Sequence, residues 1–135
     1  MGARPKVVID TNVFISAFGW QGKPWEILDQ VRHGSIINYS STALLAELQR
    51  VVAYPKLKFS NSLQSDIIEF VLANSRMATV STLPDIAIAD PDDLHVIACA
   101  IAAKAPFIIT GDPHLLDLGS INEISILTPA GFLQR

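Results

Sequence analysis

The segment Val7–Asn12 places three β-branched apolar residues directly ahead of an acid, a hydroxyl and an amide. A continuous apolar run of this kind is typical of a strand buried on both faces, as the central strands of a parallel sheet are. Asp10 lies where this strand ends, and open α/β sheets bind their ligands at the carboxyl ends of the strands. The segment therefore predicts a parallel sheet with a carboxylate at its functional edge. Asp10 or Thr11 could equally cap the following helix, and this segment alone leaves that alternative open.

Strand-like and helix-like patterns alternate along the rest of the chain, which predicts an α/β fold with a mainly parallel sheet. Beside the first strand, strands are expected at residues 36–39, 78–80, 107–110 and 124–127. Helices are expected at residues 25–32, 42–53, 61–75 and 91–104, with short helical turns after Asp112 and at 129–133. Residues 19–24 read as a break. A chain of 135 residues without a linker or repeat predicts a single domain, 1–135.

The composition excludes several classes of protein. No apolar run reaches the roughly 18 residues of a membrane helix, and no apolar signal segment precedes the first strand, so a cytoplasmic location is expected. The single Cys99 excludes an intramolecular disulfide and a cysteine-cluster zinc site, and its apolar neighbours predict a core residue. The net charge of −3 is unusual for a nucleic-acid binder, unless a cluster of acids masks a local basic surface.

Four acids occupy positions that the predicted topology can bring together. Asp10 and Asp112 each follow an apolar strand, and Asp93 opens the helix that precedes the second of these strands. Strand carboxyl ends and the starts of the following helices share one edge of a parallel sheet, so these three carboxylates can converge. Glu47 lies on the apolar stripe of its helix and can reach them only if that helix crosses the edge. Alternatively, Glu47 is an edge acid that pairs with Arg50.

Converging carboxylates favour a bound cation. Without one they repel each other and raise each other's pKa values. Mg²⁺ and Mn²⁺ take oxygen ligands, and such ions activate water and neutralise charge on a phosphodiester. Asn12 and Thr110 lie where they could support the ligating carboxylates. The alternative is that Asp90 and Asp93 simply provide good helix-start chemistry around Pro91.

The histidines fit a metal site less well. His33 lies at a helix end, His95 near the start of the alanine-rich helix, and His114 after Asp112. Their spacing does not suggest zinc, and a surface or hydrogen-bonded histidine is the preferred interpretation for each.

Four motifs in this order resemble those of a PIN domain. They are Val-Ile-Asp-Thr-Asn-Val near the N-terminus, Leu-Leu-Ala-Glu-Leu mid-chain, Asp-Pro-Asp-Asp before the alanine-rich helix, and Ile-Ile-Thr-Gly-Asp-Pro-His-Leu-Leu after it. Within that family, the sequence is similar to the small bacterial and archaeal toxin components of toxin–antitoxin pairs, related to the VapC toxins. The resemblance covers nearly the whole chain and implies a three-layer α/β/α fold.

The resemblance implies a ribonuclease that holds Mg²⁺ or Mn²⁺ with Asp10, Glu47, Asp93 and Asp112. Asn12 and Thr110 match the polar supporting positions, and Asp90 would cap its helix in the outer shell of the site. His114 stands where many relatives carry an acid, which is a peripheral departure. Members of the family commonly form homodimers, and their toxins are neutralised by a small antitoxin. A homodimer or higher homo-oligomer and an antitoxin partner are therefore expected.

The leading functional hypothesis is an endoribonuclease acting on RNA, with Arg50, Lys56 and Lys58 as candidate phosphate contacts. A solvated basic loop is the alternative interpretation of these three cations. A second hypothesis is a non-catalytic RNA-binding or RNA-processing assembly protein with the same fold. A phosphorylated receiver-like domain is disfavoured, because Thr110 leads to Gly111-Asp112 without the lysine that this chemistry needs after a late strand.

Overall fold

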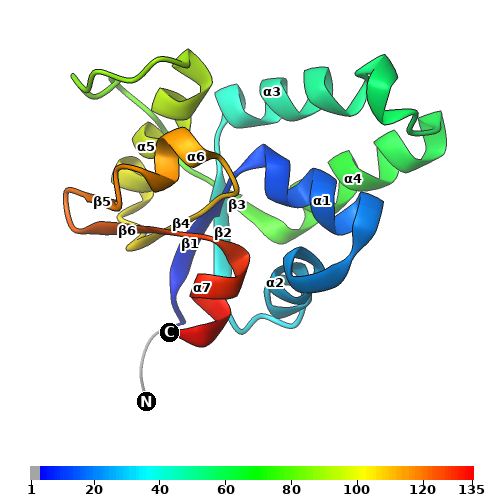
Figure 1. The fold of residues 1–135 in the computed structure, drawn as a ribbon, viewed down its shortest axis with the longest axis horizontal. Helices are drawn as coiled ribbons and strands as arrows, with labels where there is room; N and C mark the ends of the chain where they lie inside the picture. The colour runs from blue at the N-terminus through cyan, green and yellow to red at the C-terminus, as the bar shows by residue number, and fades with distance from the viewer. Residues whose placement is uncertain (1–3) are drawn as a thin grey trace.

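The computed structural model describes residues 4–135, which form a six-stranded sheet of order β3-β2-β1-β4-β6-β5 (Figure 1). The strands are β1 (Lys6–Ile9), β2 (Ile37–Ser40), β3 (Ser75–Met77), β4 (Phe107–Ile109), β5 (Ser120–Ile121) and β6 (Ile124–Leu127). Only β5 pairs antiparallel, with β6; the other neighbouring strands are parallel. The predicted α/β fold with a mainly parallel sheet is confirmed. Residues 1–3, on which the expectation of a cytoplasmic location partly rests, lie outside the residues that the structure describes.

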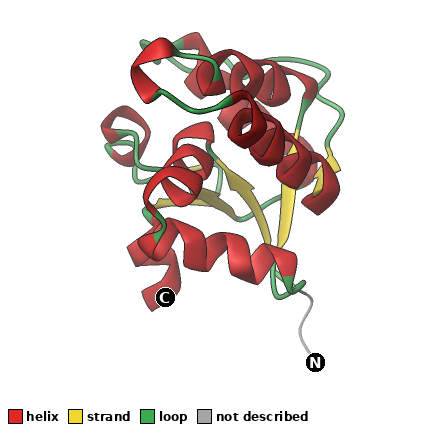
Figure 2. Cartoon of the chain, turned by 90° about the vertical axis from the view of Figure 1, so that its right-hand side faces the viewer, coloured by secondary structure: helices red, strands yellow, loops and turns green. Residues whose placement is uncertain are grey.

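Helices cover both faces of this sheet (Figures 1 and 2). They are α1 (Thr11–Trp20), α2 (Gly22–Arg32), α3 (Thr42–Val52), α4 (Asn61–Asn74), α5 (Pro91–Ala103), α6 (Pro113–Leu116) and α7 (Pro129–Gln134), with a 3₁₀ turn η1 (Pro55–Leu57). Val7 and Ile9 of β1 pack with α1, α2, α4 and α7, whereas Val8 packs on the opposite face against α5. Burial on both faces explains the continuous apolar run of β1. None of the helices within residues 4–135 is long and apolar enough to cross a membrane.

Helix α3 lies across the carboxyl edge of the sheet and joins the two cores. Its Leu44 packs in the core on the α5 side, and its Leu48 and Val52 pack in the core on the α1 side. Ser41 caps the helix, because its side chain accepts a hydrogen bond from the Leu44 N–H. The Glu47 side chain, between Leu44 and Leu48, is therefore carried to the edge where β1 and β4 end.

The buried side chain of Asn38 ties three strands together. Its Oδ1 accepts a hydrogen bond from the Ile9 N–H of β1 at 3.0 Å, and its Nδ2 donates to the Ser75 Oγ of β3 at 2.9 Å. The amide thus satisfies a backbone donor at the end of β1 that would otherwise be buried without a partner. This contact fixes the position of the residue immediately before Asp10.

Two predicted boundaries are wrong. The edge strand expected at residues 78–80 lies at Ser75–Met77, because β2 offers a ladder only as far as Ser40, whose carbonyl oxygen accepts from the Ala78 N–H. The helix expected to begin at Trp25 begins at Gly22, since Gln21 and Gly22 adopt φ angles of 60° and 67° and make the break there short. Pro24 is accommodated in the first turn, where a missing N–H costs nothing.

Strand β5 was not predicted. It forms a hairpin with β6 through Asn122 and Glu123, which have φ angles of 47° and 65°. Two consecutive left-handed residues are typical of a tight hairpin turn, but such turns usually carry a glycine. Asn122-Glu123 lacks this glycine, so the sequence does not predict the hairpin.

Candidate metal centre

Asp10 lies at the carboxyl end of β1 and is only 4% exposed. Its Oδ1 accepts a hydrogen bond from the Thr11 N–H at 2.8 Å, so it caps α1. Its Oδ2 accepts from Asn12 Nδ2 at 3.0 Å and from Thr110 Oγ1 at 2.8 Å. The two interpretations of Asp10 are therefore compatible, because the same carboxylate caps a helix and faces the site.

Asn12 and Thr110 also fix the loop that carries Asp112. The Thr110 hydroxyl oxygen accepts a hydrogen bond from the Asp112 N–H at 3.0 Å, and Asn12 Oδ1 accepts from the Gly111 N–H at 2.9 Å. Asn12 and Thr110 thus connect the ends of β1 and β4, which are neighbours in the sheet. This arrangement holds the carboxylates of Asp10 and Asp112 at a fixed separation.

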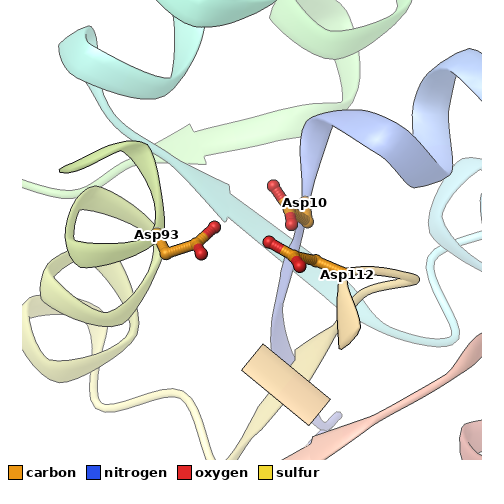
Figure 3. A group of neighbouring side chains, drawn as sticks. All are labelled: Asp10, Asp93 and Asp112. Atoms are coloured by element: carbon orange, nitrogen blue, oxygen red, sulfur yellow. The ribbon is translucent and has the colours of Figure 1, made fainter. Parts of the chain in front are cut away.

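The carboxylates of Asp10, Asp93 and Asp112 converge, each from a different segment (Figure 3). One oxygen from each residue lies within 4.8 Å of the other two. Asp93 is 4% exposed in the first turn of α5, and Asp112 caps α6 by accepting from the His114 N–H at 2.9 Å. Residues distant in sequence therefore meet at the carboxyl edge of the sheet, as the topology predicts.

Burial and crowding make these carboxyls reluctant to ionise. Burial raises the pKa of Asp93 to about 8, with further contributions from Asp112 and Asp10. Burial also raises the pKa of Asp10, although hydrogen bonds from Thr110 and Thr11 oppose the shift. The Oδ2 atom of Asp93 is buried and has no hydrogen-bond partner within residues 4–135. A buried acceptor without a partner is costly, and either a proton shared with Asp112 or a bound cation would relieve that cost.

Glu47 lies at the same site but is held separately from the three aspartates. Its Oε1 accepts a hydrogen bond from the Thr11 hydroxyl at 2.7 Å. Burial raises the pKa of Glu47 to about 7, with a further contribution from the charge of Asp10. Glu47 is not paired with Arg50 by an ion pair within the described residues; Arg50 instead pairs with Asp92 at 3.0 Å. The condition under which Glu47 could reach the other acids, a helix that crosses the sheet edge, is met by α3, whereas the alternative pairing of Glu47 with Arg50 is not seen in the described residues.

The four acids Asp10, Glu47, Asp93 and Asp112 all line one cavity of about 440 Å³. Asp90 also lines it and caps α5 by accepting from the Asp92 N–H at 3.0 Å. Along α1 the lining runs from Asp10 through Thr11 and Asn12 to Ser16, and along α3 it runs from Glu47 to Val51. The cavity is therefore a groove between α1 and α3 with the acids at one end.

The other candidate residues do not belong to the carboxylate cluster. Lys56 is in η1 and Lys58 directly follows it; both are exposed and neither lines the groove. Arg50 is exposed beside Asp92. The histidines likewise contribute nothing to the carboxylate cluster within the described residues: His33 caps the end of α2, His114 is exposed in α6, and His95 lines a separate cavity near Ser41. Cys99 is fully buried, as its apolar neighbours predict.

Two residues of the groove with hydroxyl side chains, Thr11 and Ser16, were absent from the predicted set. Thr11 was noted at the site edge, but its role in holding Glu47 was not foreseen, because that contact depends on how α3 crosses the sheet. Ser16 lines the groove four residues after Asn12, one helical turn further along the same face. Once Asn12 is placed at the site, this spacing is a signal from which Ser16 could have been found.

The donor set fits a hard divalent cation. All the converging atoms are carboxylate oxygens, which Mg²⁺ and Mn²⁺ prefer. The unpaired Oδ2 of Asp93 would gain a partner, and the raised pKa values show that the cluster disfavours uncompensated negative charge. Asp10, Asp93 and Asp112 would hold such an ion, with Glu47 beside them.

Comparison with known proteins shows which family this fold and site represent. The PIN domain family model matches residues 6–114, so the chain belongs to the PIN domain family, as its four motifs predict. An uncharacterized protein of Methanocaldococcus jannaschii is 34% identical over 142 residues, covering 96% of this chain and 90% of that protein. A chain in the crystal structure of VapBC2 from Rickettsia felis bound to a DNA fragment from their promoter matches with a TM-score of 0.64. That match has 18% identity and covers 90% of this chain and 96% of that chain, so it shows a shared fold.

Proposed function

We propose that this protein is an endoribonuclease that hydrolyses RNA phosphodiester bonds with Mg²⁺ or Mn²⁺ as cofactor. The observation that carries the proposal is the meeting of three carboxylates within 4.8 Å, one of which has a buried oxygen without a partner. A purely structural cluster would be expected to satisfy that oxygen. Membership of the PIN domain family and the resemblance to VapC toxins support RNA as the substrate.

The chain's own residues would prepare the site. Asp10, Glu47, Asp93 and Asp112 would hold the cation, which when bound supplies charge neutralisation at the phosphate and a lower pKa for attacking water. Asn12 and Thr110 orient Asp10, and Thr11 orients Glu47.

Exposed cations would contact the phosphates outside the carboxylate cluster. Arg50 lies on α3, one turn beyond Glu47, and its pairing with Asp92 places it beside the start of α5. Tyr54 and Asp92 both hold the pKa of the Arg50 guanidinium above its usual value. Lys56 and Lys58 follow α3 and would extend this contact.

Cleavage of single-stranded RNA tests the activity. Wild-type protein with Mn²⁺ should cleave, the same protein with a chelator should not, and Asp10→Asn should lose nearly all activity. Asp66→Asn is the matched control, because Asp66 is an exposed aspartate of α4 outside the groove. Equal activity of wild type and Asp10→Asn would contradict the assignment. Cation binding without cleavage would favour the non-catalytic RNA-binding alternative.

We further propose that the protein is the toxin of a toxin–antitoxin pair and acts as a homodimer in the cytoplasm. The match to a chain of VapBC2 supports this proposal, and Leu72 of α4, 57% exposed, offers apolar surface for a second chain. Expression should arrest growth, and co-expression with the product of an adjacent small open reading frame should relieve the arrest. Size-exclusion chromatography measures the oligomeric state. Wild-type expression without growth arrest would contradict the toxin role, while leaving the nuclease proposal intact.

A further inference from the structure

Trp20 is the most exposed of the large hydrophobic residues in residues 4–135, with 69% of its surface accessible. Tryptophan is usually well buried, so a ring this exposed is informative. Trp20 ends α1, and its ring lies beside that of Phe59, with the centroids 6.4 Å apart and the ring planes tilted by 50°. Tyr54, 41% exposed, lies five residues before Phe59 at the end of α3.

The chain is built to bring these aromatic residues together. Gly19 permits Phe59 to lie directly on α1, because a Cβ at this position would come within 3.3 Å of the Phe59 Cζ. Phe59 belongs to the loop after η1, whereas Gly19 and Trp20 belong to the end of α1. A side chain at position 19 would require the Phe59 ring to shift.

The face of α1 that lines the groove of the carboxylate cluster is the face on which Trp20 lies. Ser16 is the last α1 residue that lines the groove, and Trp20 follows it by four residues on the same helical face. On the other wall Val51 is the last α3 residue, and its carbonyl oxygen accepts a hydrogen bond from the Tyr54 N–H at 3.0 Å. Helices α1 and α3 run side by side in Figure 1 and contact each other. Trp20 lies about 14 Å along α1 from Thr11.

Exposed cations accompany the aromatic residues. Lys23 lies three residues after Trp20, and Lys56 and Lys58 lie between Tyr54 and Phe59. All three lysines are exposed, and none forms an ion pair within the described part of the chain. Local positive charge in a chain of net charge −3 fits an anionic partner. Aromatic rings beside lysines are the combination that binds single-stranded nucleic acid, with bases stacked on the rings and phosphates beside the cations.

We infer that Trp20, with Phe59 beside it, is a base-stacking platform for the part of an RNA strand that extends beyond the carboxylate cluster. The inference deepens the proposed function and rests on RNA as the substrate. The platform would select single-stranded RNA, whose unstacked bases are free to lie on an aromatic ring. It would hold a base one helix length from the bond to be cleaved and would be tolerant of sequence.

Binding of a single-stranded oligoadenylate, measured with a chelator present so that no cleavage occurs, tests the platform. Trp20→Ala should weaken binding by about tenfold, and Trp20→Phe should restore most of the affinity. Leu83→Ala is the matched control, because Leu83 is 50% exposed in the loop before α5, beside Met77 and His95 and away from this surface, and it should bind like wild type. An abasic strand of the same length should bind wild type and Trp20→Ala alike.

The intrinsic fluorescence gives an independent readout. Oligoadenylate should quench the emission of wild-type protein, and the quenching should disappear in Trp20→Phe, which still contains Trp25. Equal affinity of wild type and Trp20→Ala would overturn the inference. So would Trp20 emission that changes with protein concentration and not with RNA, since that would identify an interface between copies. Because binding is measured without the cation, Trp20-dependent binding in a protein that fails to cleave would refute the nuclease and leave the platform standing.

Discussion

Asn38 on β2 and the acidic cluster at the ends of β1 and β4 differ in how their hydrogen bonds are satisfied. Asn38 is neutral, and each of its hydrogen bonds joins a different strand to β2. The cluster of Asp10, Asp93 and Asp112 is acidic, and the Oδ2 of Asp93 has no partner within residues 4–135. The first group stabilises the sheet; the second destabilises it unless a cation is present. We therefore expect the two groups to respond differently to substitution and to a divalent cation.

Replacing one aspartate should separate activity from stability most clearly. Asp93→Asn should reduce cation-dependent RNA cleavage by about 10²–10³-fold, because it removes a charged ligand from the site. In a chelator, the same variant should be at least as stable as wild type at pH 8, since it removes a buried carboxyl whose pKa is raised to about 8. Urea unfolding measures the stability. If Asp93→Asn is less stable than wild type in the chelator, its loss of activity could reflect unfolding, and the prediction would be wrong.

A divalent cation should stabilise the folded protein. At a Mn²⁺ concentration about 100-fold above its Kd, linkage predicts about 2.7 kcal/mol of added stability, or roughly 10 °C in Tm for a chain of this length. The increase should vanish in Asp10→Asn and persist in Asp66→Asn, which lies outside the groove. An equal increase in all three proteins would show that the ion binds elsewhere.

Substitutions at Asn38 and Ser75 should lower the stability of the fold and leave cation binding unchanged, which is the opposite of the result expected for the aspartates. Asn38→Ala leaves the buried Ile9 N–H without its acceptor, which typically costs about 1–3 kcal/mol. Ser75→Ala removes only the outer hydrogen bond of the amide and should cost less. Urea unfolding in a chelator compares the two variants. Both should retain the Tm increase on adding Mn²⁺, and its loss in Ser75→Ala would show that the two groups are not independent.

The convergence of Asp10 and Asp112 could be predicted because it follows from topology. The carboxyl ends of neighbouring parallel strands share one edge, whatever the details of packing. The topology also predicts that Asn12 and Thr110 lie near Asp10, since Asn12 comes shortly after the end of β1 and Thr110 directly follows β4. Asp93 could be placed at the start of its helix for the same reason.

Contacts that depend on the crossing of helices could not be predicted. The sequence suggested Arg50 as a partner of Glu47, but the tertiary fold brings Arg50 to Asp92 and Glu47 to Thr11. The position of β3 was predicted wrongly for two reasons. The pairing of an edge strand depends on the backbone of its neighbour, and Ser75–Met77 shows no alternation of apolar and polar residues. The Trp20–Phe59 contact is equally non-local, since it joins residues 39 positions apart on separate elements.

The pH dependence of the cation-free protein gives the finest distinction between the two groups. Burial raises the pKa of Glu47 from 4.5 to about 7. Below pH 4.5 this carboxyl is protonated in both the folded and the unfolded chain and does not affect stability. Between about pH 4.5 and 7 the unfolded chain loses the proton while the folded protein retains it, so stability falls as the pH rises. Above pH 7 the penalty is constant.

Glu47→Gln should therefore flatten the decline of stability with pH, whereas Asn38→Ala should lower stability by a similar amount at every pH. Urea midpoints measured in a chelator between pH 4.5 and 8 provide the comparison. The residual decline in Glu47→Gln should continue toward pH 8, because the pKa of Asp93 is raised to about 8 by burial and by Asp112. Parallel curves for wild type and Glu47→Gln would mean that Glu47 ionises normally in the fold. Glu47 would then belong with the satisfied residues, and the acidic site would reduce to the three aspartates.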